Sequence, residues 1–109
     1  MEKNPLALLE KEYTLLILQY LHLNPNGRNF EQICSSLEQA IPSKVNSRLE
    51  TLRNLGLIFK TRGEDEFEIL YVLTKRGRYI SEIVWDIFRI ILNPREVDDE
   101  DRDVLDFYR

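Results

Sequence analysis

The chain has few of the residues that small proteins use for covalent or metal-based stability. It contains one cysteine, Cys34, and one histidine, His22, among 109 residues. A single cysteine cannot form an intrachain disulfide, and one histidine with one cysteine cannot complete a structural zinc site. We therefore expect a fold held by apolar packing, with no cofactor, in a reducing and so cytoplasmic compartment.

Long apolar runs are also missing. A run such as Leu15–Leu18 is far too short to cross a bilayer, and the first residues, Met-Glu-Lys-Asn-Pro, lack the basic-then-apolar order of a signal peptide. The apolar fraction of 43% and charged fraction of 31% are typical of a soluble globular protein. A chain of this length is enough for one domain with a real core, and we expect no membrane partner.

Positive charge is scarce overall but unevenly distributed. The net charge is −4, which by itself disfavours binding to phosphate. Between Arg28 and Arg62, however, six basic residues stand against three acidic ones, whereas between Asn93 and Arg109 three basic residues stand against seven acidic ones. This division predicts a folded domain over residues 1–93 and an acidic tail over residues 94–109.

The stretch from Ile41 to Gly56 is the best-defined helix in the sequence. Pro42 favours an extended conformation at Ile41, Ser43 is a suitable N-cap, and Gly56 supplies the left-handed residue that commonly closes a helix. One apolar stripe of Val45, Leu49 and Leu52 predicts a helix buried on a single side. Its other side is rich in donors, which suits either a solvated surface or contact with a DNA major groove.

Two helices are predicted before this stretch. Residues Lys11–Leu23 are apolar on more than one face, which indicates burial on more than one face. After a turn at residues 24–27, Asn29 can cap a helix from Phe30 to about Glu38. This helix also has one apolar stripe, so together with the helix after Ile41 it forms a helix-turn-helix candidate.

After Gly56 the sequence pattern changes to that of β-strands. Leu57–Arg62 and Phe67–Leu73 are rich in β-branched and aromatic residues, and the acidic segment Gly63–Glu66 joins them as a hairpin loop. Thr74 can then cap a long helix over Lys75–Leu92, which Asn93-Pro94 ends. The last helix carries more apolar surface than one small core can cover, which favours homodimerisation through it and the Lys11–Leu23 helix.

This order of elements is that of a winged helix-turn-helix: a mainly α fold with three helices, a two-stranded wing and a long C-terminal helix. Six segments carry a resemblance to a known family: Lys11–Leu18, Arg28–Phe30, Ile41–Val45, Arg48–Leu49, Leu55–Ile58 and Tyr71–Arg78. Through them the chain from about Leu9 to Phe88 resembles the HxlR family of transcriptional regulators, within the broader MarR- and PadR-like winged helices. The resemblance implies a dimeric, sequence-specific regulator of transcription that binds double-stranded DNA with its recognition helix, residues 43–55, in the major groove. The acidic wing tip and acidic tail depart from the family pattern.

Candidate residues follow from these predictions. The candidates for DNA contact on the recognition helix are Ser43, Lys44, Asn46, Ser47, Arg48 and Thr51. The candidates for positioning on phosphates are Arg28, Arg53, Lys60 and Arg62, which are otherwise ordinary surface charges. The candidates for the dimer interface are Tyr13, Leu16, Tyr20, Ile80, Val84, Trp85, Phe88 and Ile91.

The alternative is a winged helix that binds another protein rather than DNA, favoured by the net negative charge and the acidic wing tip. We expect no enzyme, because no nucleophile, base and orienting group can be assembled from the sequence. Cys34 is expected in the core and His22 on the surface. Tyr79, Trp85 and Phe88 could line a ligand pocket at the dimer interface, but core and interface packing explains them better, so a small-molecule effector is unsupported.

Overall fold

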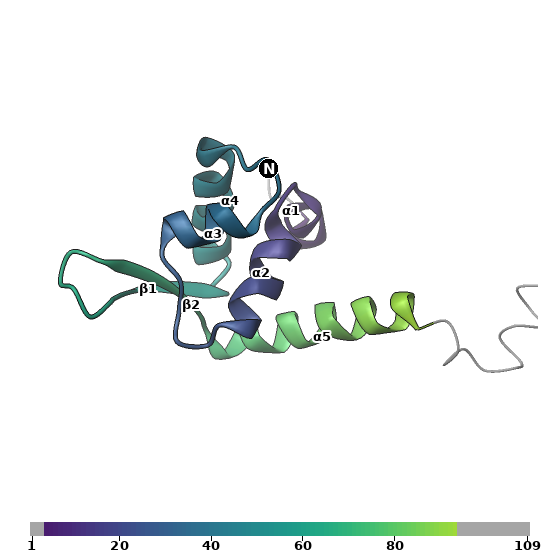
Figure 1. Cartoon of the computed structure of the whole chain (residues 1–109). Coiled ribbons are helices and arrows are strands. Elements are labelled where there is room, and N and C mark those ends of the chain that lie inside the picture. The colour runs from purple at the N-terminus through teal and green to yellow at the C-terminus, as the bar shows by residue number, and fades with distance from the viewer. Residues whose placement is uncertain (1–3, 94–109) are drawn as a thin grey trace, which may run out of the picture.

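The computed structural model describes residues 4–93, and the predicted acidic tail, 94–109, lies outside them. A short additional helix comes first, and the four helices and the hairpin that the sequence predicts follow it in the predicted order (Figure 1). They are α1 (Pro5–Glu10), α2 (Thr14–Leu23), α3 (Phe30–Ser36), α4 (Pro42–Asn54), β1 (Ile58–Arg62), β2 (Ile69–Leu73) and α5 (Lys75–Leu92). No helix in this part of the chain is long and apolar enough to cross a membrane.

The core lies where α2, α3, α4 and the base of the hairpin meet. Each helix contributes its apolar stripe, and the most deeply buried large side chains are Ile17, Leu18, Leu21, Ile33, Val45, Leu49 and Leu52. The predicted single stripe of α4 is therefore confirmed, since all three of its members are fully buried. This packing fixes α4 from one side and leaves its opposite side to face outward.

The helix predicted from Lys11 begins three residues later, at Thr14. Tyr13 adopts a left-handed backbone conformation with φ of 73°, which a non-glycine residue rarely takes and which interrupts a helix. The apolar pattern of the sequence continues through this corner, so periodicity alone could not locate it. The result is a sharp turn between α1 and α2 that lies against α4.

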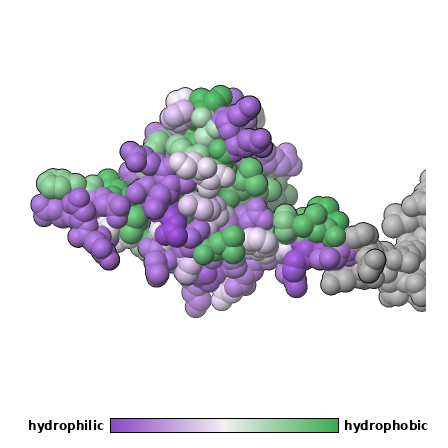
Figure 2. All heavy atoms as spheres, viewed as in Figure 1, coloured by the Kyte–Doolittle hydropathy of each residue, from purple (hydrophilic) through white to green (hydrophobic). Residues whose placement is uncertain are grey.

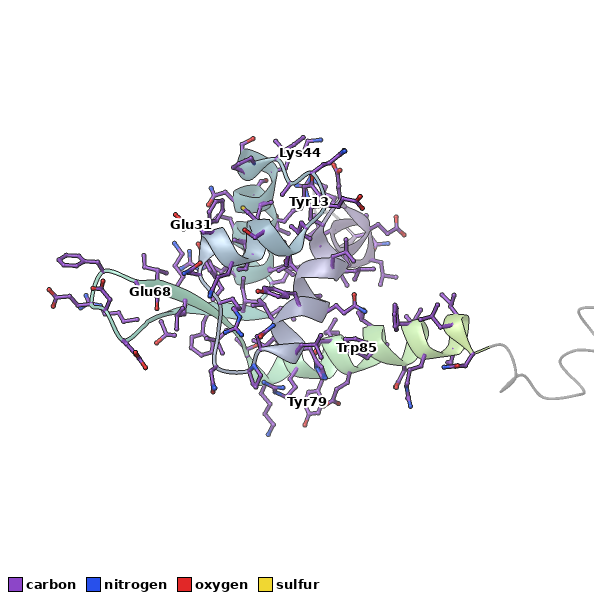
Figure 3. The ribbon with its side chains drawn as sticks, viewed as in Figure 1. Tyr13, Glu31, Lys44, Glu68, Tyr79 and Trp85 are labelled. Atoms are coloured by element: carbon purple, nitrogen blue, oxygen red, sulfur yellow. The ribbon has the colours of Figure 1, made fainter. Side chains whose placement is uncertain are left out.

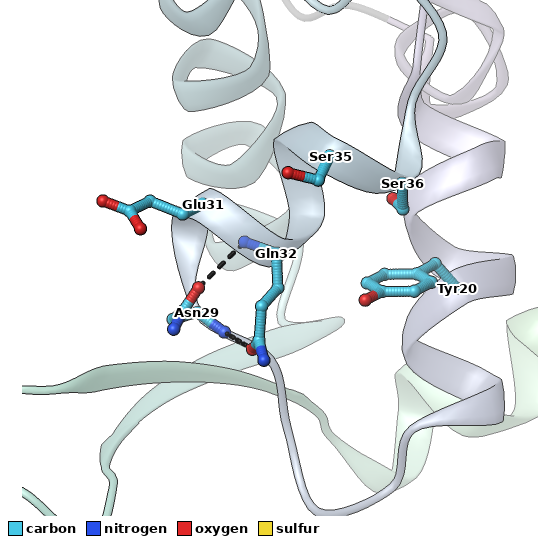
Figure 4. Close-up of a pocket in the computed structure, with 6 residues that line it drawn as sticks. All are labelled: Tyr20, Asn29, Glu31, Gln32, Ser35 and Ser36. Carbon is cyan, nitrogen blue, oxygen red and sulfur yellow. Dashed lines mark hydrogen bonds between the residues drawn. The ribbon is translucent and has the colours of Figure 1, made fainter.

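The start of α3 is as predicted. The Asn29 side chain accepts a hydrogen bond from the Gln32 amide at 2.8 Å, and the Gln32 side chain accepts one from the Asn29 amide at 2.9 Å. This reciprocal pair is a capping box, and Figure 4 shows it beside a hollow of about 430 Å³ lined by Tyr20, Ser35 and Ser36. The helix is shorter than predicted and ends at Ser36.

The start of α4 corrects one prediction. Ile41 is extended, as expected before a proline, but the helix begins at Pro42 and Ser43 makes no cap. Proline is well suited to the first helical position because its missing N–H needs no partner there. Gly56 has φ of 74° and follows the end of α4, as predicted.

The wing is a two-stranded antiparallel hairpin with Ile58 opposite Leu73 and Arg62 opposite Ile69. An isolated bridge between Arg28 and Tyr71 joins the segment before α3 to the middle of β2. The second strand starts at Ile69 rather than at Phe67, because the Asp65 carboxylate accepts the Phe67 amide at 3.0 Å and holds it in the loop. Phe67 is consequently 84% exposed.

The last helix, α5, begins and ends where predicted. The Thr74 hydroxyl accepts the Gly77 amide at 3.0 Å, and Asn93 caps the other end. The first half of α5 packs on α2, whereas the second half extends away from the body (Figure 1). Figure 2 shows apolar surface on this projecting half and at the tip of the wing.

Candidate nucleic-acid interface

The outward side of α4 is polar and accessible. With 3.6 residues per turn, Ser43 and Ser47 lie opposite the buried stripe of Val45, Leu49 and Leu52, and both are exposed. Asn46 is exposed on one flank, while Arg48 and Thr51 are half-buried. A helix that projects short polar side chains from a fixed base is the element that fits a major groove.

The two cations predicted to read bases are both in contact with Glu12, at the corner between α1 and α2. The Lys44 Nζ lies 3.2 Å from the Glu12 carboxylate. The Arg48 Nε donates to the Glu12 main-chain carbonyl at 3.0 Å. No sequence pattern predicts these contacts, because Glu12 is more than thirty residues away along the chain.

Glu50 neutralises two of the predicted phosphate contacts. Its carboxylate lies 3.1 Å from Arg53 and 3.9 Å from Lys60. Lys60 also lies over the ring of Tyr71, with Nζ 5.8 Å from the ring centroid. Burial and the nearby Glu50 carboxylate raise the pKa of the Tyr71 phenol, although Arg53 opposes the shift. This end of α4 is therefore a mixed-charge cluster rather than a positive patch.

The other two phosphate candidates, Arg28 and Arg62, share a hollow of about 560 Å³ beside the wing, towards the end where β1 meets the loop. Arg28 is positioned by its strand bridge and donates from its guanidinium to the Gly27 carbonyl at 3.0 Å. Glu64 and Glu68 also line the hollow. The structure thus brings these arginines together, but beside carboxylates that weaken their attraction for phosphate.

Tyr13 belongs to the core and not to the exposed surface expected of a dimer residue. It is 9% exposed. Its hydroxyl donates to the Gln39 carbonyl at 3.2 Å and accepts the Ile41 amide at 3.3 Å. These bonds tie the corner before α2 to the turn between α3 and α4 (Figure 3). Tyr13 therefore helps to fix where α4 begins.

The other interface candidates divide into two groups. Ile80 packs against the core of its own chain, and Val84 is half-buried on the same side of α5. Leu16, Tyr20, Trp85 and Phe88 line an open groove of about 450 Å³ between α2 and α5. Trp85 meets Phe88 edge to face at 5.2 Å between ring centroids, so packing explains much of this aromatic group.

The more exposed apolar stripe of α5 lies on a face that the sequence-based selection mostly missed. Tyr79, Ile83, Ile87 and Ile90 recur at i, i+4, i+8 and i+11, and each is at least half exposed, from 52% to 61%. Of the predicted residues, only Ile91, 71% exposed, lies close to this stripe. The sequence shows that apolar residues surround α5, which predicts an exposed apolar face. Only the packing of α5 on α2 shows which face that is.

His22 is partly exposed, and its ring also makes a contact that the surface prediction did not include. Its Nδ1 lies 2.7 Å from the hydroxyl of Ser81, which is fully buried, and its ring lies 6.2 Å from that of Trp85. The pair joins the end of α2 to α5. Cys34 is partly buried and packs against the core, and this burial raises the pKa of its thiol.

Comparison with known proteins gives relatives only among solved structures. No family model and no curated protein matches the chain. A possible HxlR-family transcriptional factor from Thermoplasma volcanium is 25% identical, with a TM-score of 0.74 over 87% of this chain and 84% of that one.

Two more distant structures were solved with DNA. A variant of Staphylococcus aureus MepR bound to an oligodeoxyribonucleotide is 20% identical, with a TM-score of 0.67 over 94% of this chain and 79% of that one. Streptococcus pneumoniae FabT in complex with DNA is 18% identical, with a TM-score of 0.67 over 92% of this chain and 75% of that one. The chain therefore has the winged-helix fold of HxlR- and MarR-type transcription regulators.

Proposed function

We propose that this protein is a dimeric, sequence-specific DNA-binding regulator of transcription that inserts α4 into the major groove. The observation that carries the proposal is the outward side of α4, where Ser43, Asn46 and Ser47 are exposed above a fully buried stripe. The similarity to DNA-bound winged helices supports it further.

Within this proposal, the first two turns of α4 read the bases. Ser43 and Ser47 are short enough to let the helix approach the groove floor, and Asn46 can pair with adenine. Arg48, held at its Nε, can offer its terminal nitrogens to guanine or phosphate. Arg28, which is bridged to β2, and Arg62, at the loop end of β1, are the proposed phosphate contacts outside α4.

Dimerisation would use the exposed stripe of α5. Large apolar side chains exposed at helical spacing over three turns are unusual on a monomer, and a second copy of the same helix is a matching partner. Full burial of a large apolar side chain contributes roughly 1.5–3 kcal/mol, and these four side chains are 52% to 61% exposed. About half of that contribution from each of them, in both copies, can therefore offset the cost of association.

The direct test is selection of sites from a random pool of double-stranded DNA with the full chain. The proposal predicts an enriched palindrome with half-sites about 34–36 Å apart, and binding that weakens steeply with salt. Arg48→Ala should then lose at least about fivefold in affinity, the effect of one good contact. Lys75→Ala, which removes the same charge from exposed α5, is the control. Absence of any enriched site at low salt would refute the proposal.

A second candidate function has its own observation. The wing tip carries Glu64, Asp65 and Glu66 next to the exposed ring of Phe67, and carboxylates are repelled by DNA phosphates. A winged helix that binds a basic protein surface would show this combination. Recovery of a protein partner that is lost in a Phe67→Ala variant, with no DNA retained at low salt, would favour this function over DNA binding.

A further inference from the structure

Glu12 contacts the proposed recognition helix through two different groups. Its carboxylate lies 3.2 Å from Lys44 Nζ, and its main-chain carbonyl accepts the Arg48 Nε at 3.0 Å. The backbone there is held by the left-handed Tyr13 and by the bonds of the Tyr13 hydroxyl to the turn before α4. Glu12 is therefore fixed beside α4, and Figure 3 shows Tyr13 and Lys44 at the same end of the molecule.

The two contacts have opposite effects on the availability of the cations. A carbonyl bond to Nε uses one edge of the guanidinium and restrains the side chain, but it leaves the charge and both terminal nitrogens in place. A carboxylate at 3.2 Å from Lys44 instead supplies the oxygen and the negative charge that a DNA phosphate would supply. Phosphate can then bind Lys44 only by replacing an ion pair that already exists.

We propose that Glu12 determines which cation of α4 contacts DNA: it positions Arg48 for contact and masks Lys44. This inference rests on the proposed DNA-binding function and deepens it. The side chains of Lys44 and Glu12 are both about half exposed, at 48% and 54%, so this ion pair and a pair between Lys44 and a phosphate are of similar, small strength. Lys44 therefore adds little to the affinity for any DNA sequence, because it exchanges one ion pair for another. Arg48, whose charge is not paired by the Glu12 carbonyl, contributes its full charge to binding.

The test is a double-mutant cycle of the full chain with Glu12→Gln, Lys44→Ala and the combined variant. The glutamine keeps the carbonyl that holds Arg48 and removes only the carboxylate charge. Affinity for the selected DNA site, and for an unrelated duplex, is measured by fluorescence anisotropy over a series of salt concentrations. Thermal melts of each variant confirm that the exposed substitutions leave the fold intact.

In the parent, Lys44→Ala should weaken binding by less than about twofold, because an exposed ion pair contributes so little. Glu12→Gln should strengthen binding by up to about fivefold. Because one more phosphate is neutralised, it should also steepen the slope of log affinity against log salt by about 0.9. The higher affinity and the steeper salt dependence should both disappear when Lys44→Ala is added to Glu12→Gln.

Other outcomes overturn the proposal. A gain from Glu12→Gln that survives Lys44→Ala means that Glu12 acts by general repulsion of DNA. A large loss from Lys44→Ala in the parent means that Lys44 is not masked. Glu10→Gln, the same charge change on exposed α1, is the matched control and should leave affinity within about twofold of the parent at a Debye length of roughly 10 Å. If the parent binds no DNA, the proposed function itself is refuted. If the parent binds DNA but Glu12→Gln changes neither the affinity nor the salt dependence, only the role of Glu12 is refuted.

Discussion

Substitution of Gly77 tests the close contact between the start of α5 and the residue before β1. Gly77 is buried in the first turn of α5, where its amide bonds the Thr74 hydroxyl. A Cβ added there would lie against the Leu57 carbonyl, 2.8 Å from its carbon and 3.2 Å from the Leu57 Cα. Ordinary contacts between carbon atoms are about 3.5–4.0 Å, so Gly77→Ala would force α5 away from the strand entry.

The cost can be worked out from what the displacement breaks. The Leu57 carbonyl also accepts the Thr74 amide at 2.9 Å, and the Thr74 hydroxyl donates to the Gly56 carbonyl at 2.7 Å. Overpacking of this kind costs about 1–3 kcal/mol, and the helix preference for alanine returns at most about 1 kcal/mol. The net loss is therefore at most about 3 kcal/mol, and at its middle value of about 1.5 kcal/mol the midpoint of thermal unfolding should fall by about 6–12 °C.

The assay is thermal unfolding followed by circular dichroism, at fixed protein concentration because dimerisation would raise the midpoint. Gly63→Ala is the control, since its added Cβ would meet only the movable side chain of Glu68. That variant should stay within about 0.5 kcal/mol of the parent. If both variants unfold at the parent temperature, the close approach of α5 to Leu57 is wrong.

Three further predictions concern the proposed dimer, the α3 cap and the buried ionisable groups. If the chain forms the proposed dimer, Ile87→Glu should convert it to a folded monomer in light scattering, because it places a charge in the middle of the exposed α5 stripe, and a persistent dimer would exclude that face. Asn29→Ala should lower the free energy of unfolding by about 1 kcal/mol through loss of the cap, measured by urea titration, and an unchanged midpoint would contradict it. Because burial raises the pKa of the Cys34 thiol above its ordinary 9.0 and that of the Tyr71 phenol above its ordinary 10.0, the folded state binds more protons than the unfolded state at alkaline pH. The free energy of unfolding should therefore fall as pH rises above about 9, and a rise there would refute the shifts.

Much of the local structure could be predicted from the sequence, because its determinants act over a few residues. The cap at Asn29, the left-handed Gly56, the cap at Thr74 and the end of α5 at Asn93 all depend on neighbouring side chains and backbone preferences. The buried stripe of α4 followed from helical periodicity alone. These features were enough to predict the order of elements and hence the winged helix.

Some local predictions failed because a competing contact was stronger than the local preference. Ser43 was a plausible cap, but Pro42 takes the first helical position and starts the helix earlier. Phe67 fitted the alternating strand pattern, but the Asp65 carboxylate binds its amide and keeps it in the loop. In each case two allowed backbone conformations differ little in free energy. One hydrogen bond to the Phe67 amide, or the fixed φ of the Pro42 ring, is enough to select between them.

The sequence by itself determined the helices, the hairpin and the polar side of α4, since each depends on residues close together along the chain. Only the tertiary structure decided which surface each residue meets. In the folded chain the Tyr13 hydroxyl bonds the turn before α4, and Glu12 contacts Lys44 and Arg48. The apolar stripe of α5 that includes Ile87 stays exposed. These contacts join residues far apart in sequence, and their energies depend on distances that no periodic pattern contains.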